Sequence, residues 1–528
     1  MAIVRLKKFL IILFVVGGSA YLAAATYTTA DCSRSAFQAA ANSASDGDTV
    51  QGPLAGGSAT WTTSLTTTKS LIINGNGCAI TLSSTDGIQM LSTNASVYPR
   101  ITNFTFGGKD GQAAVRIDGS NPHFRVDHNT FADLSVRSIV INYGGVVGSA
   151  TQAYGVIDHN TIHNVSGYAA INVYGHNDTW FSDTNYGTSS AVYVEDNTIT
   201  WASGTASPSQ TAVDCEHGGR VVVRFNTITD GTIGLHDTGS SPKSRSCRIF
   251  ERYNNTFHND VNDSNADSVL SYRGGTGMDF NNSIPINGSG NHGWAHAIGA
   301  EIKRLTCVST GQCGEPMDFG VQYPDPHAVC SSFRGWCSVV NGSCDSSSDC
   351  GGNTCNLTTS PPNDAACGTG YRGITNIDSP TGYPARDQTG VSKDDPATNT
   401  QTAAASPAYS WNNIDSNNGN ALITGTTMVD YSGTGSYILP NREFYLQVLP
   451  FTGATGVGVG LLSARPSSCT PRVGYWATDE SKLYVCTATN AWTAYYTPYT
   501  YPHPLQGAGG LQGAGGPTAP TGVTAIVR

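Results

Sequence analysis

The sequence predicts an all-β protein built mainly as a right-handed parallel β-helix, a solenoid of short stacked coils with a disulfide-rich insert and a small C-terminal cap. Three observations support this prediction. The 528 residues include 61 glycines and only 12% are charged, against roughly 25% in an average globular protein, a composition that disfavours an all-α fold. A signature of asparagine, threonine or serine, and an apolar residue recurs along the first half. Short runs of alternating polarity flank each copy, as expected for strands.

The repeated signature sets the length of one coil. Successive copies are separated by 31, 37, 29, 29 and 27 residues, and a unit this short cannot bury its apolar face unless neighbouring units stack. A β-propeller is the alternative, but its blades need about 40–45 residues. We expect each asparagine to take the left-handed bend and its amide to bond to the next rung. The copies begin at Asn129, Asn160, Asn197, Asn226, Asn255 and Asn282, with looser ones at Asn74 and Asn103.

The N-terminus reads as a signal peptide over residues 1–25. Basic residues within 5–8 precede an apolar run over 9–16, and three alanines at 23–25 would suit cleavage. We therefore expect a secreted or cell-surface protein with no membrane span after cleavage. Removing the three basic residues leaves 25 Lys and Arg against 38 Asp and Glu, near −13. This acidic balance argues against a nucleic-acid partner.

The rest of the chain divides by composition. Fourteen cysteines in an exported chain indicate disulfides, and Cys32 with Cys78 and Cys469 with Cys486 are candidate local pairs. The aromatic segment near the C-terminus is either a packed cap or a platform for sugar rings. We expect the β-helix over 26–300, a cysteine-rich insert over 301–400, late coils or a cap over 401–465, an aromatic C-terminal cap over 466–505, and a Gly-rich linker and tail over 506–528.

The strand that follows the loop in each coil supplies the candidate surface. Alternation points the first and third residues of each strand inward, so the second and fourth form two outward columns. One column reads Arg116, Val140, Asn172, Asp214, Gly234 and Ser271, and the other reads Asp118, Asn142, Tyr174, Glu216, His236 and Arg273.

The carboxylate of Glu216, the imidazole of His236 and the guanidinium of Arg273 would lie on consecutive rungs. Together such groups can hold an anionic sugar and remove a proton from it. The alternative is a solvated sheet face of paired charges. Oxygen ligands on this face would suit Ca²⁺, the candidate cofactor. The predicted catalytic residues are His236, Arg273 and Glu216; the predicted substrate-binding residues are Tyr174, Asn172, Asn142, His217, Arg245 and Arg248; and the predicted metal ligands are Asp214, Glu216 and Asp237.

One arginine breaks the pattern of the strand before the turn. Arg252 lies three residues before Asn255, where the other coils place valine or isoleucine. We expect a locally shifted strand there, with an inward arginine and a partner as the alternative.

The N-terminal coils resemble a known family. Residues 46–50 (Asp-Gly-Asp-Thr-Val), and Thr60-Trp61 before the strand at 71–73, are similar to secreted right-handed β-helix proteins of the pectate-lyase-like superfamily. The resemblance covers roughly residues 30–300 and implies the fold. It leaves function open, because this fold carries lyases, inverting glycoside hydrolases, esterases, tailspikes and adhesins.

The family's calcium and arginine motif has no full match in this chain. We predict action on an extracellular, acidic polysaccharide by β-elimination. The alternatives are a non-catalytic glycan-binding adhesin or tailspike-like protein, and an inverting glycoside hydrolase. The sugar and the oligomeric state stay open.

Overall fold

The computed structural model describes most of the predicted coils and the C-terminal region. The signal peptide, the Gly-rich tail and most of the cysteine-rich insert lie outside the described residues. These are 24–91, 94, 96–119, 123–142, 153–165, 169–175, 177–201, 211–235, 246–258, 270–272, 274–285, 296–298, 317–318, 322–323, 335–337, 343–344, 355–356, 389–395, 400–401, 406–422, 428–430 and 439–507.

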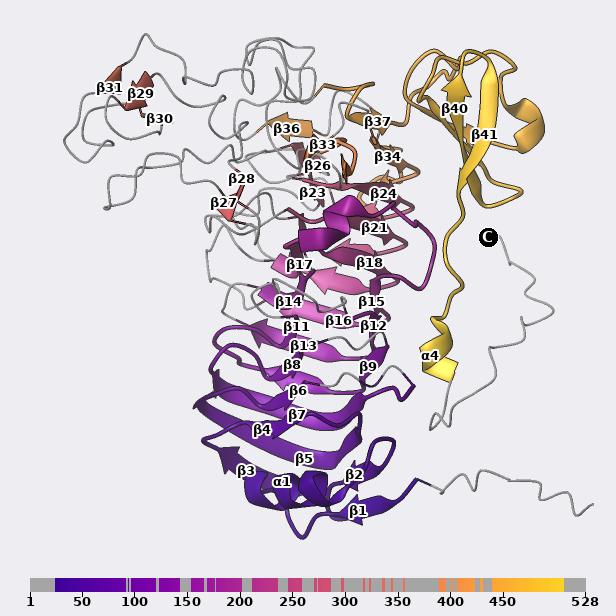
Figure 1. The fold of residues 1–528 in the computed structure, drawn as a ribbon. Coiled ribbons are helices and arrows are strands. Elements are labelled where there is room, and N and C mark those ends of the chain that lie inside the picture. Colours follow the sequence, from indigo (N-terminus) through magenta and orange to yellow (C-terminus); the bar gives the residue numbers. More distant parts are fainter. Residues whose placement is uncertain are drawn as a thin grey trace, which may run out of the picture.

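Twenty strands form one long parallel sheet, here called sheet 1, and its strands rise in register along the molecule (Figure 1). The strands are β1 (Thr26–Thr28), β2 (Thr49–Gln51), β3 (Gly57–Trp61), β5 (Ile72–Thr85), β7 (Arg100–Asp110), β9 (Phe124–Asp127), β10 (Thr130–Ala132), β12 (Gly155–Asp158), β13 (Thr161–Val165), β15 (Val192–Glu195), β16 (Thr198–Trp201), β18 (Arg220–Arg224), β19 (Thr227–Thr229), β21 (Ile249–Tyr253), β22 (Thr256–His258), β24 (Thr276–Phe280), β25 (Ser283–Ile284), β34 (Ala408–Trp411), β35 (Ile414–Asp415) and β37 (Phe444–Leu446).

A second parallel sheet of ten strands, sheet 2, runs beside it. Its strands are β4 (Leu65–Thr67), β6 (Ile88–Met90), β8 (Val115–Ile117), β11 (Ile139–Ile141), β14 (Ala169–Tyr174), β17 (Thr211–Glu216), β20 (Thr232–Leu235), β23 (Leu270–Tyr272), β26 (His296–Ile298) and β36 (Met428–Asp430). In the insert, the described strands are β27 (Met317–Asp318), β28 (Gln322–Tyr323), β29 (Gly335–Cys337), β30 (Ser343–Cys344), β31 (Cys355–Asn356), β32 (Asp394–Asp395) and β33 (Thr400–Gln401).

Most repeats contribute three strands to these sheets: one before the asparagine turn, one after it, and one in sheet 2. The coil around Asn160 shows the pattern, because Ile157, Ile162 and Ile171 come from its three strands and all join one buried core. Successive coils pair in parallel, as β12 does with β9 and β15. The protein is therefore an all-β molecule of stacked parallel sheets, an arrangement consistent with a β-helix.

A short helix lies at the N-terminal end of the stack (Figure 1). Helix α1 (Arg34–Ser43) begins at Ser33, whose hydroxyl accepts a hydrogen bond from the Ala36 amide at 3.2 Å. Its Phe37 side chain is fully buried in the core, 5.9 Å from the ring of Trp61. The helix thus covers apolar surface that the first coil would otherwise expose.

Stacked asparagines hold the turns together, as the repeat predicts. The amide nitrogen of Asn197 donates to the side-chain oxygen of Asn226 at 3.0 Å, and the backbone N–H of Asn197 donates to the same atom at 3.0 Å. The ladder runs through seven fully or almost fully buried asparagines. They are Asn129, Asn160, Asn197, Asn226, Asn255, Asn282 and Asn413.

The left-handed bend lies one residue earlier than expected. His128, His159 and Asp196, which precede ladder asparagines, have φ of 53°, 53° and 59°. The ladder asparagines are not among the described residues with positive φ. The looser copy at Asn103 is also offset by one residue. Asn103 itself has the positive φ, and the next residue, Phe104, stands where the other coils have the ladder asparagine: its backbone N–H donates to the Asn129 side chain.

Replacing Asn226 with alanine tests the ladder. The side chain donates to the carbonyls of Val194 and Arg224 and to Asn255, and it accepts from Asn197. Because alanine leaves buried groups on neighbouring rungs unpaired, we expect the free energy of unfolding to fall by about 2–3 kcal/mol. Urea denaturation measures this loss, and a change below about 0.5 kcal/mol would contradict it. Replacing the exposed Asn420, for which φ is not positive, is a surface control.

The Arg252 strand is not shifted, so the expected register shift is wrong. β21 pairs with β18 in unbroken register, with Arg252 beside Val223, and the arginine is fully buried in the interior. Its Nε and Nη2 atoms contact the Asp279 carboxylate at 2.5 and 2.8 Å, and Nη1 donates to the Ile233 carbonyl at 3.2 Å. A buried ion pair between consecutive coils therefore lies inside the stack.

Three disulfides are present among the described residues. The expected pairs Cys32–Cys78 and Cys469–Cys486 are confirmed. A third bond, Cys215–Cys247, was not predicted. Such bonds are compatible with an extracellular protein.

The C-terminal region folds back along the outward face of sheet 1. A four-stranded sheet, here the C-terminal module, comprises β38 (Val457–Gly460), β39 (Gly474–Ala477), β40 (Lys482–Ala488) and β41 (Ala491–Tyr496). It lies beside the upper part of the stack (Figure 1). Its Trp476 ring lies 5.0 Å from that of Trp411 and 5.3 Å from that of Phe280. One apolar cluster therefore joins the module to the outward face of sheet 1.

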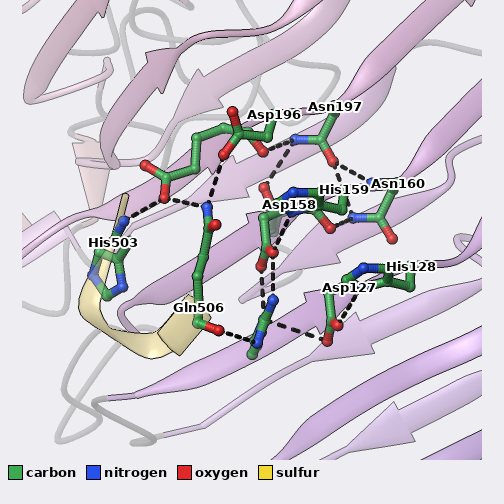
Figure 2. Close-up of polar contacts among 12 residues, drawn as sticks. Asp127, His128, Asp158, His159, Asn160, Asp196, Asn197, His503 and Gln506 are labelled. Atoms are coloured by element: carbon green, nitrogen blue, oxygen red, sulfur yellow. Dashed lines mark hydrogen bonds and ion pairs between the residues drawn. The ribbon is translucent and has the colours of Figure 1, made fainter. Parts of the chain in front are cut away.

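Residues 497–507, here the C-terminal strap, continue down the same face and end in helix α4 (Pro504–Gly507). The Arg224 guanidinium donates to the carbonyls of Tyr499 and Thr500 at 2.8 and 2.9 Å. Figure 2 shows His503 and Gln506 beside the acidic side chains of the stack. The backbone N–H of His503 donates to the buried Glu195 carboxylate at 2.7 Å. The strap thus satisfies charges that the outward face of sheet 1 buries.

Candidate functional site

The predicted site residues lie on the outward face of sheet 2, at the ends of adjacent strands. The register aligns Asn172 with Asp214 and Tyr174 with Glu216 between β14 and β17. The intervening Cys215 is in the core, as alternation requires. Asn172, Asp214, Tyr174 and Glu216 therefore share one face within two rungs, as the aligned columns predict.

The Asn172 amide connects the two carboxylates. Its Nδ2 atom donates to Glu216 Oε1 at 3.0 Å and reaches Asp214 Oδ2 at 3.4 Å. The exposed fractions are 0% for Asn172, 2% for Asp214 and 8% for Glu216. Burying two ionised carboxylates side by side is costly unless donors or cations compensate them. The Asn172 amide is one of the donors that compensate this cost.

Arg137 fixes the orientation of that amide. Its Nε atom donates to Asn172 Oδ1 at 2.7 Å, which turns the NH₂ group of Asn172 toward the carboxylates. The Arg137 backbone N–H is itself held by Asp110 at 2.9 Å. Sequence analysis missed Arg137, because it precedes β11 in the loop and the aligned columns covered only strand residues.

Tyr174 and His217 border Glu216. Their rings lie 5.1 Å apart, and His217 Nε2 is 3.6 Å from Glu216 Oε2. Burial raises the pKa of the Tyr174 phenol above its usual value, and the nearby Glu216 charge raises it further. Tyr174 therefore stays protonated at neutral pH and can serve as a hydrogen-bond donor.

The other two described predictions lie farther from the carboxylates. Asn142 is 3% exposed, and its amide approaches the Tyr174 carbonyl at 3.5 Å. Arg248 is 1% exposed; its guanidinium lies 4.7 Å from the Trp180 ring and donates to the Ser182 carbonyl at 3.2 Å. Arg248 is therefore part of the packed wall beside the site.

This wall is tied to the carboxylate strand. Residue Ser246 forms a β-bridge with Glu216, and the neighbouring Cys247 is disulfide-bonded to Cys215, the residue between the two acids. Trp180, in the short helix η1 (Asn177–Phe181), donates its indole N–H to the Ser246 carbonyl at 3.1 Å. The position of Glu216 is thus fixed from three directions.

The remaining predictions, His236, Asp237, Arg245 and Arg273, lie outside the described residues and stay predictions. Among the residues that the structure describes, no group of three or more His, Cys, Asp or Glu is arranged to hold a metal ion. Asp214 and Glu216 offer the hard oxygen donors that Ca²⁺ prefers, but they supply only part of a coordination shell.

The fold and this face define a class: an all-β protein of stacked parallel sheets that carries a buried pair of carboxylates on one outer face. No family model and no curated protein matches the chain. Within the described part of the chain, no helix is both long and apolar enough to cross a membrane.

Proposed function

We propose that this chain is a secreted right-handed β-helix protein of the pectate-lyase-like type, which cleaves an acidic extracellular polysaccharide by β-elimination. The observation that supports this proposal is the shared Asn172 amide between Asp214 and Glu216. Two acids arranged in this way place carboxylate oxygens side by side, and such oxygens are the ligands that Ca²⁺ bridging to a uronate carboxylate would use. The function thus rests on the chemistry of one described cluster.

The residues would divide the work as follows. Asp214 and Glu216, with Asp237, would hold Ca²⁺, which when bound neutralises the uronate carboxylate. Arg273 would stabilise charge as the C5 proton next to that carboxylate leaves, and His236 would accept the proton. The C4–O bond would then break as the C4–C5 double bond forms, and the released sugar oxygen would take a proton from water. Asn172, oriented by Arg137, would keep the two acids in place, and Tyr174, hydrogen-bonded to Glu216, would help to hold that acid.

The carboxylate geometry favours a lyase over an inverting hydrolase. Inverting enzymes separate their two carboxyl groups by about 6.5–9.5 Å to admit a water molecule. Here one oxygen of each acid lies within 3.4 Å of the same nitrogen atom. These two oxygens therefore lie no farther apart than about the lower limit of that spacing.

Replacing both Asp214 and Glu216, with Asn and Gln, tests the proposed reaction. We expect the rate at which unsaturated product forms, followed by its ultraviolet absorbance on a panel of uronate polymers, to fall at least 100-fold. Losses of this size follow when a group that stabilises charge in the transition state is removed. EDTA should have the same effect on the unaltered chain, and added Ca²⁺ should restore it.

Two results would count against the lyase. Saturated reducing ends without ultraviolet absorbance would indicate a hydrolase. Glycan binding without any cleavage, unchanged in the double variant, would indicate an adhesin or tailspike-like protein. The variant Lys109→Gln, an exposed change on sheet 1, is the matched control.

A further inference from the structure

The C-terminal module also carries aromatic side chains on the other face of its sheet. On β40, Leu483 and Val485 are buried against the outward face of sheet 1, whereas Tyr484 between them points the other way. On the neighbouring strand β41, Trp492 is half-buried. The module thus leaves the Tyr484 and Trp492 rings partly exposed, although Trp492 also packs against the cluster that joins the module to the stack.

Arg465 lies across these rings. Its guanidinium carbon is 4.4 Å from the Tyr484 ring centre and 5.4 Å from that of Trp492, within the range of cation–π attraction. Among the described residues, no carboxylate lies within ion-pair distance of Arg465, and its Nη1 atom, which is itself buried, has no hydrogen-bond partner. A fixed positive charge therefore lies beside two aromatic faces without a protein anion.

The nearby acids are already engaged. Glu480 contacts the Tyr484 hydroxyl and lies 3.7 Å from the Lys482 ammonium. Asp479 accepts a hydrogen bond from the Leu462 backbone N–H at 2.9 Å. Neither acid lies within ion-pair distance of the Arg465 guanidinium.

The loop that carries Arg465 is held rigidly. It follows the short helix η4 (Leu462–Ala464) and ends at Cys469, which is disulfide-bonded to Cys486 on β40. The Trp492 indole N–H donates to the Pro466 carbonyl at 2.8 Å, so ring and loop are fixed together. Little conformational freedom would be lost on binding a ligand.

We propose that Tyr484, Trp492 and Arg465 form a binding platform for an acidic polysaccharide. The parts of the two rings that Arg465 leaves open can pack against the apolar face of a sugar ring. The guanidinium can attract a uronate carboxylate by its charge and by a hydrogen bond from an atom other than the buried Nη1. The platform extends the proposed function, since it takes the same class of polymer. It lies on a different sheet from Asp214 and Glu216, so the two sites can be tested separately.

Affinity electrophoresis and calorimetry on polygalacturonate, alginate and hyaluronan test the platform. The fully methyl-esterified form of polygalacturonate keeps the sugar face and removes the charge. We expect Arg465→Gln to weaken binding of the acidic polymers about tenfold or more and to leave the weaker binding of the ester unchanged. Trp492→Ala should weaken both. Near-ultraviolet circular dichroism checks that each variant is folded.

The controls separate this site from the proposed active site. Lys109→Gln removes an exposed cation elsewhere and should bind like the unaltered chain. The variant with Asp214 and Glu216 replaced should keep its platform affinity, and Arg465→Gln should keep turnover of short oligosaccharides. Equal affinities for Arg465→Gln and Lys109→Gln, or no binding of any of these polymers by the unaltered chain, would overturn the platform.

Discussion

Replacing Asp279 with alanine is expected to lower the free energy of unfolding by about 3–5 kcal/mol, the cost of leaving a buried charge without its partner. The side chains of Arg252 and Asp279 are both 0% exposed. The guanidinium also contacts the Ile233 carbonyl and lies 4.6 Å from the Phe250 ring centre. Without Asp279, the buried guanidinium of Arg252 loses the two charged hydrogen bonds that this carboxylate accepts. Urea denaturation followed by circular dichroism measures the loss.

Two further variants test whether the loss of stability comes from the unpaired buried charge. Replacing the pair together, Arg252 with Met and Asp279 with Leu, should recover most of the stability, because apolar side chains of similar size suit this interior. Asp183→Ala breaks the exposed pair with Lys393, whose side chains are 77% and 42% exposed, and should cost less than about 1 kcal/mol. A loss for Asp279→Ala no larger than this would show that Arg252 is not held in the interior.

The Arg252 pair also shows why the sequence prediction failed there. Alternation correctly placed residues such as Val213 and Cys215 in the core, because the period of a strand decides the face and needs no partner. An inward arginine is tolerated only when an anion on another rung reaches it. The missed signal was periodic: Asp279 lies three residues before Asn282, as Arg252 lies three before Asn255.

In the candidate site too, the residues on the strands were predictable from the sequence and the contacts from loops were not. The strand register brought Asn172, Asp214 and Glu216 together as expected. Arg137 approaches from the loop before β11, and the Cys215–Cys247 bond joins segments separated by 32 residues. Such contacts depend on how loops close over the sheet, and one strand's alternation carries no information about loop paths.

Acid is expected to weaken the C-terminal strap through His503. The imidazole is 4% exposed and lies 4.7 Å from the Tyr193 ring. Burial lowers the pKa of His503 to about 3, and the charges of Arg224, His123 and Arg125 lower it further. Because this folded-state pKa lies below the usual value near 6.5, the stability it contributes is present above pH ~6.5 and is lost as the pH falls. Between pH ~6.5 and ~4.5 we expect a loss of about 2–3 kcal/mol.

The variant His503→Asn isolates this effect. Asparagine keeps an acceptor for the Leu505 N–H, which His503 Nδ1 now accepts at 3.2 Å, but it does not titrate. Glu195 and Glu251 have pKa values raised by burial, so they add stability at low pH that is lost as the pH rises, in both chains alike. The difference between the two urea-unfolding profiles therefore reports His503. Parallel profiles from pH 7 to pH 4.5 would show that His503 is free to take up a proton in the folded chain. Faster proteolysis of the strap in acid, seen only in the unaltered chain, would support the burial of His503 as a neutral ring.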